Sequence, residues 1–325
     1  MKYFIVLLVL VQGSLGLAQR PDFESLKSAI QEAKSEESRL RALTEYGNAL
    51  PNNRHQEILR LADSISLLVD ESSSPELANA TSQFLRGISH FKGQDYFKAK
   101  SYLKFSATYF HQTDDELEFI TLNTLGLTYI RLRELDSAIY LYNRMLRDLP
   151  DDNLRGRISA HGNLGSVYRQ SGNYAKAITH LETVYQLDSS NAFTRINTVL
   201  NIAHIYNDME LFDRAIHTLK AFDISSVPPI PPKSVYYNNL ANSYLKSGQL
   251  DSGLIFIKQG LEVARQINYP QGEFTALSNL IECRMELQQY DSIPKLFSAL
   301  EQKADARRID APMRINFLKG NYYLK

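Results

Sequence analysis

The residues best able to do chemistry are seven histidines and one cysteine, Cys283, and they are scattered along 325 residues. A metal site built on one helix needs two histidines four residues apart, and no histidines here have that spacing. The sequence also lacks the HExxH motif, the GxxxxGK[ST] phosphate loop and the GxGxxG fingerprint. One cysteine cannot form a disulfide framework or a cysteine-rich metal site. We therefore predict a chain that is not an enzyme, with no catalytic residue, no metal ligand and no cofactor.

The overall charge argues against an anionic partner. The chain has 36 basic and 36 acidic residues, so its formal net charge is zero. Nucleic-acid binding normally needs a basic surface, and the composition offers no excess of positive charge for one. Apolar residues make up 44% of the chain and charged residues 22%, which is typical of a folded protein.

The first residues resemble an export signal. Lys2 precedes eight apolar residues at 4–11, and small residues follow at Gly16 and Ala18. This is the layout of a secretory signal peptide over 1–18, cleaved near Ala18. The alternative, a membrane anchor, needs a longer apolar run. No later segment has 18 consecutive apolar residues, so we expect an exported, periplasmic or extracytoplasmic chain with no direct membrane insertion after cleavage.

The rest of the sequence repeats with a period of about 39 residues. In one copy, Gly126 is followed by Tyr129 three residues later and by Ala138 twelve residues later. The same spacing recurs at Gly165 and Ala177. The positions equivalent to Gly126 are Gly87, Gly126, Gly165, Ala203, Ala241, Ile281 and Gly320. Such periodicity predicts a stack of supersecondary units, none of which can bury its apolar faces alone.

Each repeat has the pattern of two amphipathic helices joined by a short turn. Ala138, Tyr142 and Met145 fall on one stripe of the second helix. The small residue of the first helix, such as Gly126, is expected to face the small residue of the second, Ala138, so that the helices approach closely. Replacing Gly126 by leucine should then overpack the hairpin.

The repeat resembles the tetratricopeptide repeat. The resemblance rests on Leu122, Leu125, Gly126, Tyr129, Ala138, Tyr142 and Pro150 in one copy. It is specific over four copies at 118–266 and weaker at 76–112 and 272–304. The period is longer than the usual one of about 34 residues, as in exported tetratricopeptide regions of bacterial signalling proteins. The resemblance implies an all-α, right-handed α-solenoid of stacked helix-turn-helix hairpins, a superhelix like that of tetratricopeptide proteins.

The register divides the chain into four parts. After the signal peptide, 19–73 is predicted to form an N-terminal hairpin, a degenerate repeat. Residues 74–304 form an array of about six repeats, and 305–325 form either the first helix of a further, truncated repeat or a capping helix. Between two repeats lies a proline-rich segment, 228–232, which is read as a stiff spacer or as a polyproline ligand for another protein.

In arrays that resemble this one, the first helices line a concave groove that binds peptides. Residues two positions before each small residue should then face inward, and these are Asn163, Asn201, Asn239 and Asn279. Positions one or four residues after it add Arg169, His204, Asn207 and Asn242. A carboxamide both donates and accepts hydrogen bonds, so a row of them can hold a peptide backbone. The alternative role is structural, in which the asparagines bridge or cap neighbouring helices.

The function expected from the resemblance is non-catalytic binding of a peptide or protein segment. We expect the chain to be the extracytoplasmic sensory region of a bacterial membrane signalling protein, with an output domain downstream if the sequence is truncated. The alternative is a free periplasmic adaptor or an envelope assembly scaffold.

Overall fold

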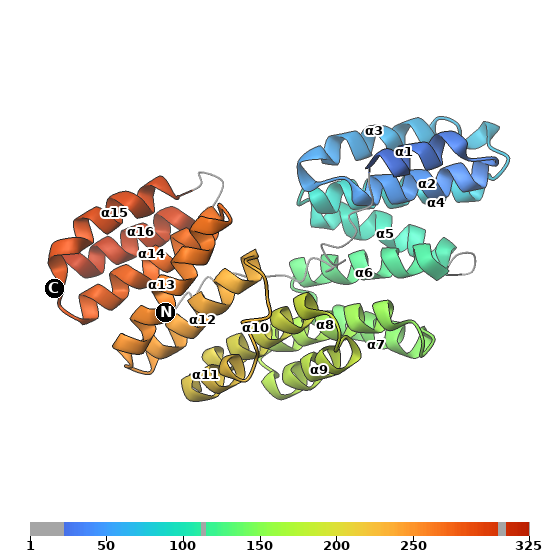
Figure 1. Cartoon of the computed structure of the whole chain (residues 1–325). Helices are drawn as coiled ribbons and strands as arrows, with labels where there is room; N and C mark the ends of the chain where they lie inside the picture. The colour runs from blue at the N-terminus through green and yellow to red at the C-terminus, as the bar shows by residue number, and fades with distance from the viewer. Residues whose placement is uncertain (1–22, 112–114, 305–309, 325) are drawn as a thin grey trace. The chain divides into compact units, whose positions relative to one another are not determined.

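The structure is a computed structural model that describes residues 23–111, 115–304 and 310–324. The predicted signal peptide lies outside the described residues. All regular structure within the described ranges is helical, without a strand, so the predicted all-α fold is confirmed. Figure 1 shows the helices arranged as successive antiparallel hairpins.

The helices fall into two compact units, divided between His180 and Leu181 inside α9. The helices up to the division are α1 (Phe23–Glu32), α2 (Glu36–Ala49), α3 (His55–Ser66), α4 (Pro75–Lys92), α5 (Tyr96–Phe110), α6 (Asp115–Arg131), α7 (Leu135–Asp148), α8 (Leu154–Gln170) and α9 (Tyr174–Leu187). The helices after it are α10 (Ala192–Asp208), α11 (Phe212–Lys220), α12 (Pro231–Lys246), α13 (Leu250–Gln266), α14 (Pro270–Glu286), α15 (Ile293–Gln302) and α16 (Asp310–Tyr323).

Within each unit the first helix of one hairpin packs against the first helix of the next. In the first unit α2, α4, α6 and α8 contact one another in succession, and in the second unit α10, α12, α14 and α16 do the same. Gly126 and the residues equivalent to it in the other repeats all lie in first helices, as the register predicted. Each unit therefore stacks its hairpins in the order of the sequence.

The turn inside each hairpin has a recurrent left-handed residue that the sequence did not reveal. It follows the repeat's small residue by seven positions and is Gln94, Arg133, Gly172, Glu210, Gly248 or Gln288, with φ between 56° and 78°. The next residue donates its N–H to a carbonyl five residues back, as Glu134 does to Tyr129 at 2.9 Å. This is the Schellman arrangement, which satisfies carbonyls at the helix end.

Arg133→Gly should raise the free energy of unfolding by about 1 kcal/mol, because only glycine adopts φ of 63° without crowding by a Cβ atom. Gly172→Ala at the equivalent turn should lower it by about the same amount. Urea unfolding followed by circular dichroism measures both changes. A loss of stability in Arg133→Gly would contradict the expectation.

The close approach of paired helices depends on a contact other than the one predicted. A Cβ atom on Gly126 would lie 2.4 Å from Cζ of Tyr142, and one on Gly87 would lie 2.7 Å from Cγ of Leu103. Both partners stand sixteen residues after the glycine, whereas the prediction placed Ala138 opposite Gly126. Tyr142 and Leu103 are fully buried. Glycine here makes room for a large side chain of the second helix.

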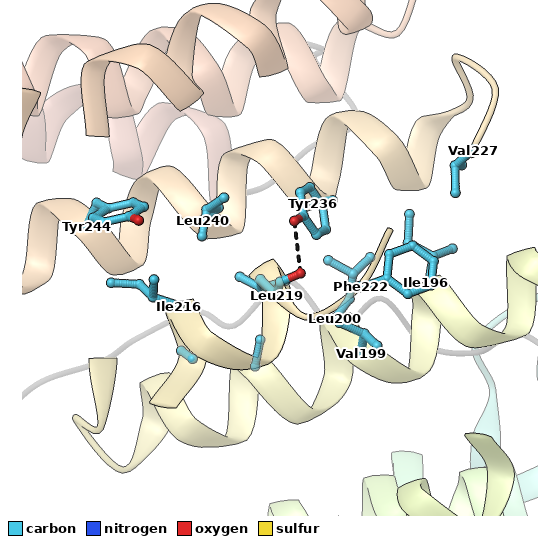
Figure 2. Packing of buried hydrophobic residues seen from close by; sticks show 12 residues of the cluster. Ile196, Val199, Leu200, Ile216, Leu219, Phe222, Val227, Tyr236, Leu240 and Tyr244 are labelled. Carbon is cyan, nitrogen blue, oxygen red and sulfur yellow. Dashed lines mark hydrogen bonds between the residues drawn. The ribbon is translucent and has the colours of Figure 1, made fainter. Parts of the chain in front are cut away.

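Apolar clusters join consecutive hairpins within a unit. Figure 2 shows Leu200 of α10, Leu219 of α11 and Tyr236 of α12 in one such cluster. The Tyr236 hydroxyl donates to the Leu219 carbonyl at 2.9 Å, and burial raises the pKa of this phenol to about 12. The proline-rich segment 228–232 leads into α12, whose first residue is Pro231. Val227, just before this segment, is buried, with 2% of its surface exposed.

The end of α2 is held by a lysine from a different hairpin. The ammonium group of Lys92, at the last position of α4, donates to the carbonyl of Asn48 at 2.7 Å and to that of Leu50. These carbonyls lie at the C-terminal end of α2, where helix carbonyls lack partners within the helix. Burial lowers the pKa of Lys92 to about 8.

Candidate functional site

The predicted asparagines lie on the first helices, and in the first unit one of them bridges two helices. Asn163 of α8 is 6% exposed, and its Nδ2 donates to Oδ1 of Asn123 in α6 at 2.9 Å. The hydroxyl of Ser159 donates to the same oxygen at 3.1 Å. Asn163 thus makes the helix-bridging contact that was considered as its alternative role.

In the second unit, α10 and α12 are joined by two polar contacts. Nδ2 of Asn239 lies 3.1 Å from Nε2 of His204, and it donates to the ring when that nitrogen is unprotonated. One helical turn further on, the hydroxyl of Ser243 donates to Oδ1 of Asn207 at 3.0 Å. Three of the predicted residues are therefore brought together on one face. All three are half-buried, so they combine mutual contact with partial access to solvent.

The next pair of first helices, α12 and α14, is bridged through the backbone. Asn279 is 6% exposed, and its Nδ2 donates to the carbonyl of Asn238 at 3.4 Å. The Asn238 side chain in turn donates to the carbonyl of Gly272 at 3.3 Å. The side chain of Asn279 is consequently occupied between helices.

Three predicted residues are left with more open positions. Asn201 of α10, Asn242 of α12 and Arg169, in the last turn of α8, are all half-buried. The carboxamides of Asn201 and Asn242 make no side-chain hydrogen bond in the part of the chain described. Peptide binding by any of the eight residues stays a prediction, and these two asparagines are the best placed for it.

Several polar residues of these contacts were not predicted. Asn123 and Asn238 stand three positions before the small residue of their repeats, one position before the predicted ladder. Ser159 and Ser243 stand one helical turn from a predicted asparagine. A search for hydrogen-bonding residues at both adjacent register positions would have found the first two.

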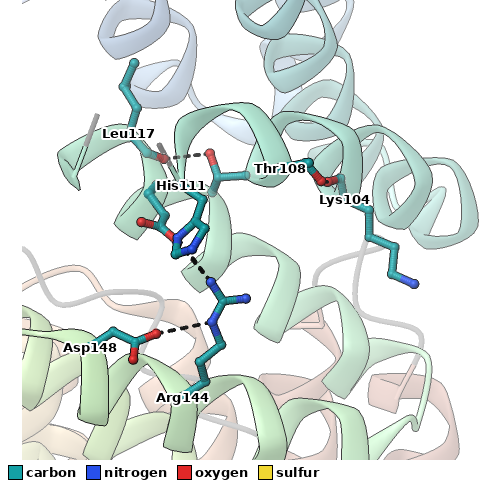
Figure 3. A network of polar contacts seen from close by, with 8 residues as sticks. Lys104, Thr108, His111, Leu117, Arg144 and Asp148 are labelled. Carbon is teal, nitrogen blue, oxygen red and sulfur yellow. Dashed lines mark hydrogen bonds and ion pairs between the residues drawn. The ribbon is translucent and has the colours of Figure 1, made fainter. Parts of the chain in front are cut away.

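A second polar network lies at the junction of α5, α6 and α7. Oε1 of Glu118 lies 2.7 Å from Nδ1 of His111 and 3.5 Å from the guanidinium of Arg144. Figure 3 shows Arg144 between His111 and Asp148, with its Nε donating to Asp148 at 3.2 Å. Because an arginine fills the centre, the network suits helix attachment better than metal binding. No group of three potential metal ligands occurs in the described ranges.

The lone cysteine is also placed for packing. Cys283 is fully buried on α14 beside Ala241 and Ile257, and burial raises the pKa of its thiol. A raised thiol pKa means less of the nucleophilic thiolate at neutral pH.

The stacked helical hairpins define a helical-repeat scaffold, a kind of protein that binds other proteins. Family models of the tetratricopeptide repeat match residues 158–191 and 235–267. The chain therefore contains tetratricopeptide repeats, as the resemblance implied. Scaffolds of this kind are typically non-catalytic.

Solved structures of low sequence identity share this fold. The apo form of RapI is 14% identical, with a TM-score of 0.66 over 93% of this chain and 80% of RapI. A chain of the APC/C hetero-tetramer Cut9–Hcn1 is 15% identical, with a TM-score of 0.56 over 91% of this chain and 52% of that one. A comparison with proteins of curated function gave no match. Among the described helices, none has the length and apolar character needed to cross a bilayer.

Proposed function

We propose that the chain binds a peptide or an extended protein segment along the exposed face of its first helices. The observation that carries this proposal is the row of half-buried amide and imidazole groups on α10 and α12. Asn201, His204 and Asn207 lie on α10, and Asn239 and Asn242 lie on α12.

The chemistry of this face suits a neutral backbone better than a charged ligand. Carboxamides supply donors to peptide carbonyls and acceptors to peptide N–H groups in equal measure. Among the five side chains named above, histidine is the only titratable type, so the face offers no cluster of cations to a polyanion. An extended backbone, with alternating donors and acceptors, is the complementary ligand.

A random-peptide display library tests this proposal, followed by calorimetry with the peptide that is selected. Asn201→Ala combined with Asn242→Ala should weaken binding about five- to 150-fold, since each of the two lost hydrogen bonds contributes about 0.5–1.5 kcal/mol. Thermal unfolding should hardly change, because neither carboxamide bridges helices.

Asn143→Ala is the matched control, since Asn143 is a half-buried carboxamide on the second helix α7. Its affinity should equal that of the wild type. Equal affinity in the double variant, or failure to select any peptide, would contradict the proposal.

The location that we propose is extracytoplasmic, with the chain acting as the sensory region of a membrane signalling protein. The support is the signal-like sequence of residues 1–18. N-terminal sequencing of the protein from fractionated cells should give Gln19 in the extracytoplasmic fraction. An intact Met1 in the cytoplasmic fraction would overturn the proposal.

A free periplasmic adaptor or assembly scaffold is the rival role. The two are separated by the gene sequence after Lys325, where a sensory region requires an apolar span of about 20 residues. A stop codon at that place favours the adaptor.

A further inference from the structure

Two histidines that are far apart in the sequence contact each other inside one hairpin. Nδ1 of His161, on α8, lies 2.9 Å from Nδ1 of His180, on α9, and the ring centroids are 5.1 Å apart. At this distance one ring donates its N–H to the lone pair of the other, so at least one ring must be neutral. With both rings protonated, two donors and two positive charges would face each other.

The same two positions hold leucines or aromatic residues in some other hairpins, and no other described hairpin has a histidine at either of them. They stand four residues before and fifteen after the repeat's small residue. In the preceding hairpin they are Leu122 and Leu141, both buried. In another they are Tyr237 and Phe256, whose rings stack at 6.5 Å. The histidines therefore occupy a contact that depends on apolar packing in these two hairpins and that does not titrate near neutral pH there.

We propose that this histidine pair makes the α8–α9 hairpin acid-sensitive. Protonation of both rings removes their hydrogen bond and places like charges in the contact between the two helices. The hairpin then opens more often in acid than its neighbours do. Tyr168 of α8 stacks on His180 at 5.4 Å, so opening also disrupts an aromatic contact.

The surroundings of the pair oppose protonation. Arg157 from α8 and Lys176 from α9 add positive charge. Arg157 is itself paired with the exposed Asp151 at 3.3 Å, in the loop before α8. Asn123, which faces α8 from α6, is uncharged. No acidic side chain among these groups faces the imidazoles to stabilise a second positive charge.

The direction of the pH effect follows from these conditions. Burial, and then the charge of His180, lowers the pKa of His161 to about 4, and burial followed by Lys176 lowers that of His180. The unfolded chain binds protons near pH 6.5, so it holds more protons than the folded chain between about 6.5 and 4. The stability of the hairpin is therefore present above this window and is lost as pH falls through it.

Hydrogen exchange on the full chain tests the proposal. After correction for intrinsic rates, amides of α8 and α9 should exchange on the order of tenfold faster at pH 5 than at pH 7. In His161→Leu combined with His180→Leu, which copies Leu122 and Leu141, the acceleration should vanish. If that variant fails to fold, His161→Tyr combined with His180→Phe serves instead, because it reproduces the stack of Tyr237 and Phe256.

His217→Leu is the control, since His217 is an exposed histidine on α11. It should keep the wild-type acceleration in α8 and α9. The same acceleration in a variant that lacks the pair, or none in the wild type, would overturn the proposal.

Discussion

Gly126→Ala should lower the free energy of unfolding by about 2 kcal/mol. The new methyl group would lie 2.4 Å from Cζ and 2.6 Å from the hydroxyl oxygen of Tyr142. The ring cannot easily withdraw, because Tyr142 is fully buried and its hydroxyl donates to the carbonyl of Asn123 at 3.2 Å. Overpacking costs up to about 3 kcal/mol, and the better helix propensity of alanine returns about 1 kcal/mol.

Two further variants separate this steric effect from helix propensity. Gly162→Ala places its methyl group where no atom lies within 4 Å, so it should stabilise the chain by up to about 1 kcal/mol. Tyr142→Leu added to Gly126→Ala reproduces Ala203 and Leu219, which pack together in another hairpin. Urea unfolding should show that the two substitutions together cost less than the sum of their separate effects on the free energy of unfolding, by about 1 kcal/mol or more. Additive losses would refute the steric explanation.

Lys92→Met should lower the free energy of unfolding by about 2 kcal/mol. Methionine keeps the apolar stem but removes the donor to the carbonyls of Asn48 and Leu50. Two carbonyls at the end of α2 then lose a charged partner in a site where burial limits their access to water. Thermal and urea unfolding measure the change.

Lys104→Met is the matched control for this variant. Lys104 is an exposed lysine on α5, so its replacement should change stability by less than about 0.5 kcal/mol. A similarly small effect at Lys92 would contradict the prediction. It would mean that water replaces the ammonium group without a loss in the free energy of unfolding.

The repeat register predicted which helix each residue occupies, because large side chains are excluded wherever two helices approach closely. It did not predict the partner of Gly126, since both Ala138 and Tyr142 lie on the contacting stripe of α7. The left-handed turns were missed because Arg133 and Glu210 adopt a conformation that glycine normally marks.

The polar contacts were harder to predict because they join residues of different helices. Asn163 and Asn123 are forty residues apart, and their pairing depends on how two first helices pack. His161 and His180 were missed because a search for spacings of four residues considers one helix only. A comparison of equivalent positions between repeats would have marked these two histidines as unusual.

The register of the turns also determines where the chain can change length. Five second helices begin nine residues after the repeat's small residue, yet the repeats differ in period. An added residue between Gly126 and Tyr142 would rotate everything after it by about 100° and misalign the contact. Between α11 and α12, Phe222 and Val227 are buried in an apolar cluster, but the exposed residues 225–226 and 228–229 carry no such constraint. Insertions and deletions among homologues, and epitope tags in the laboratory, should be tolerated there and rejected inside the hairpins.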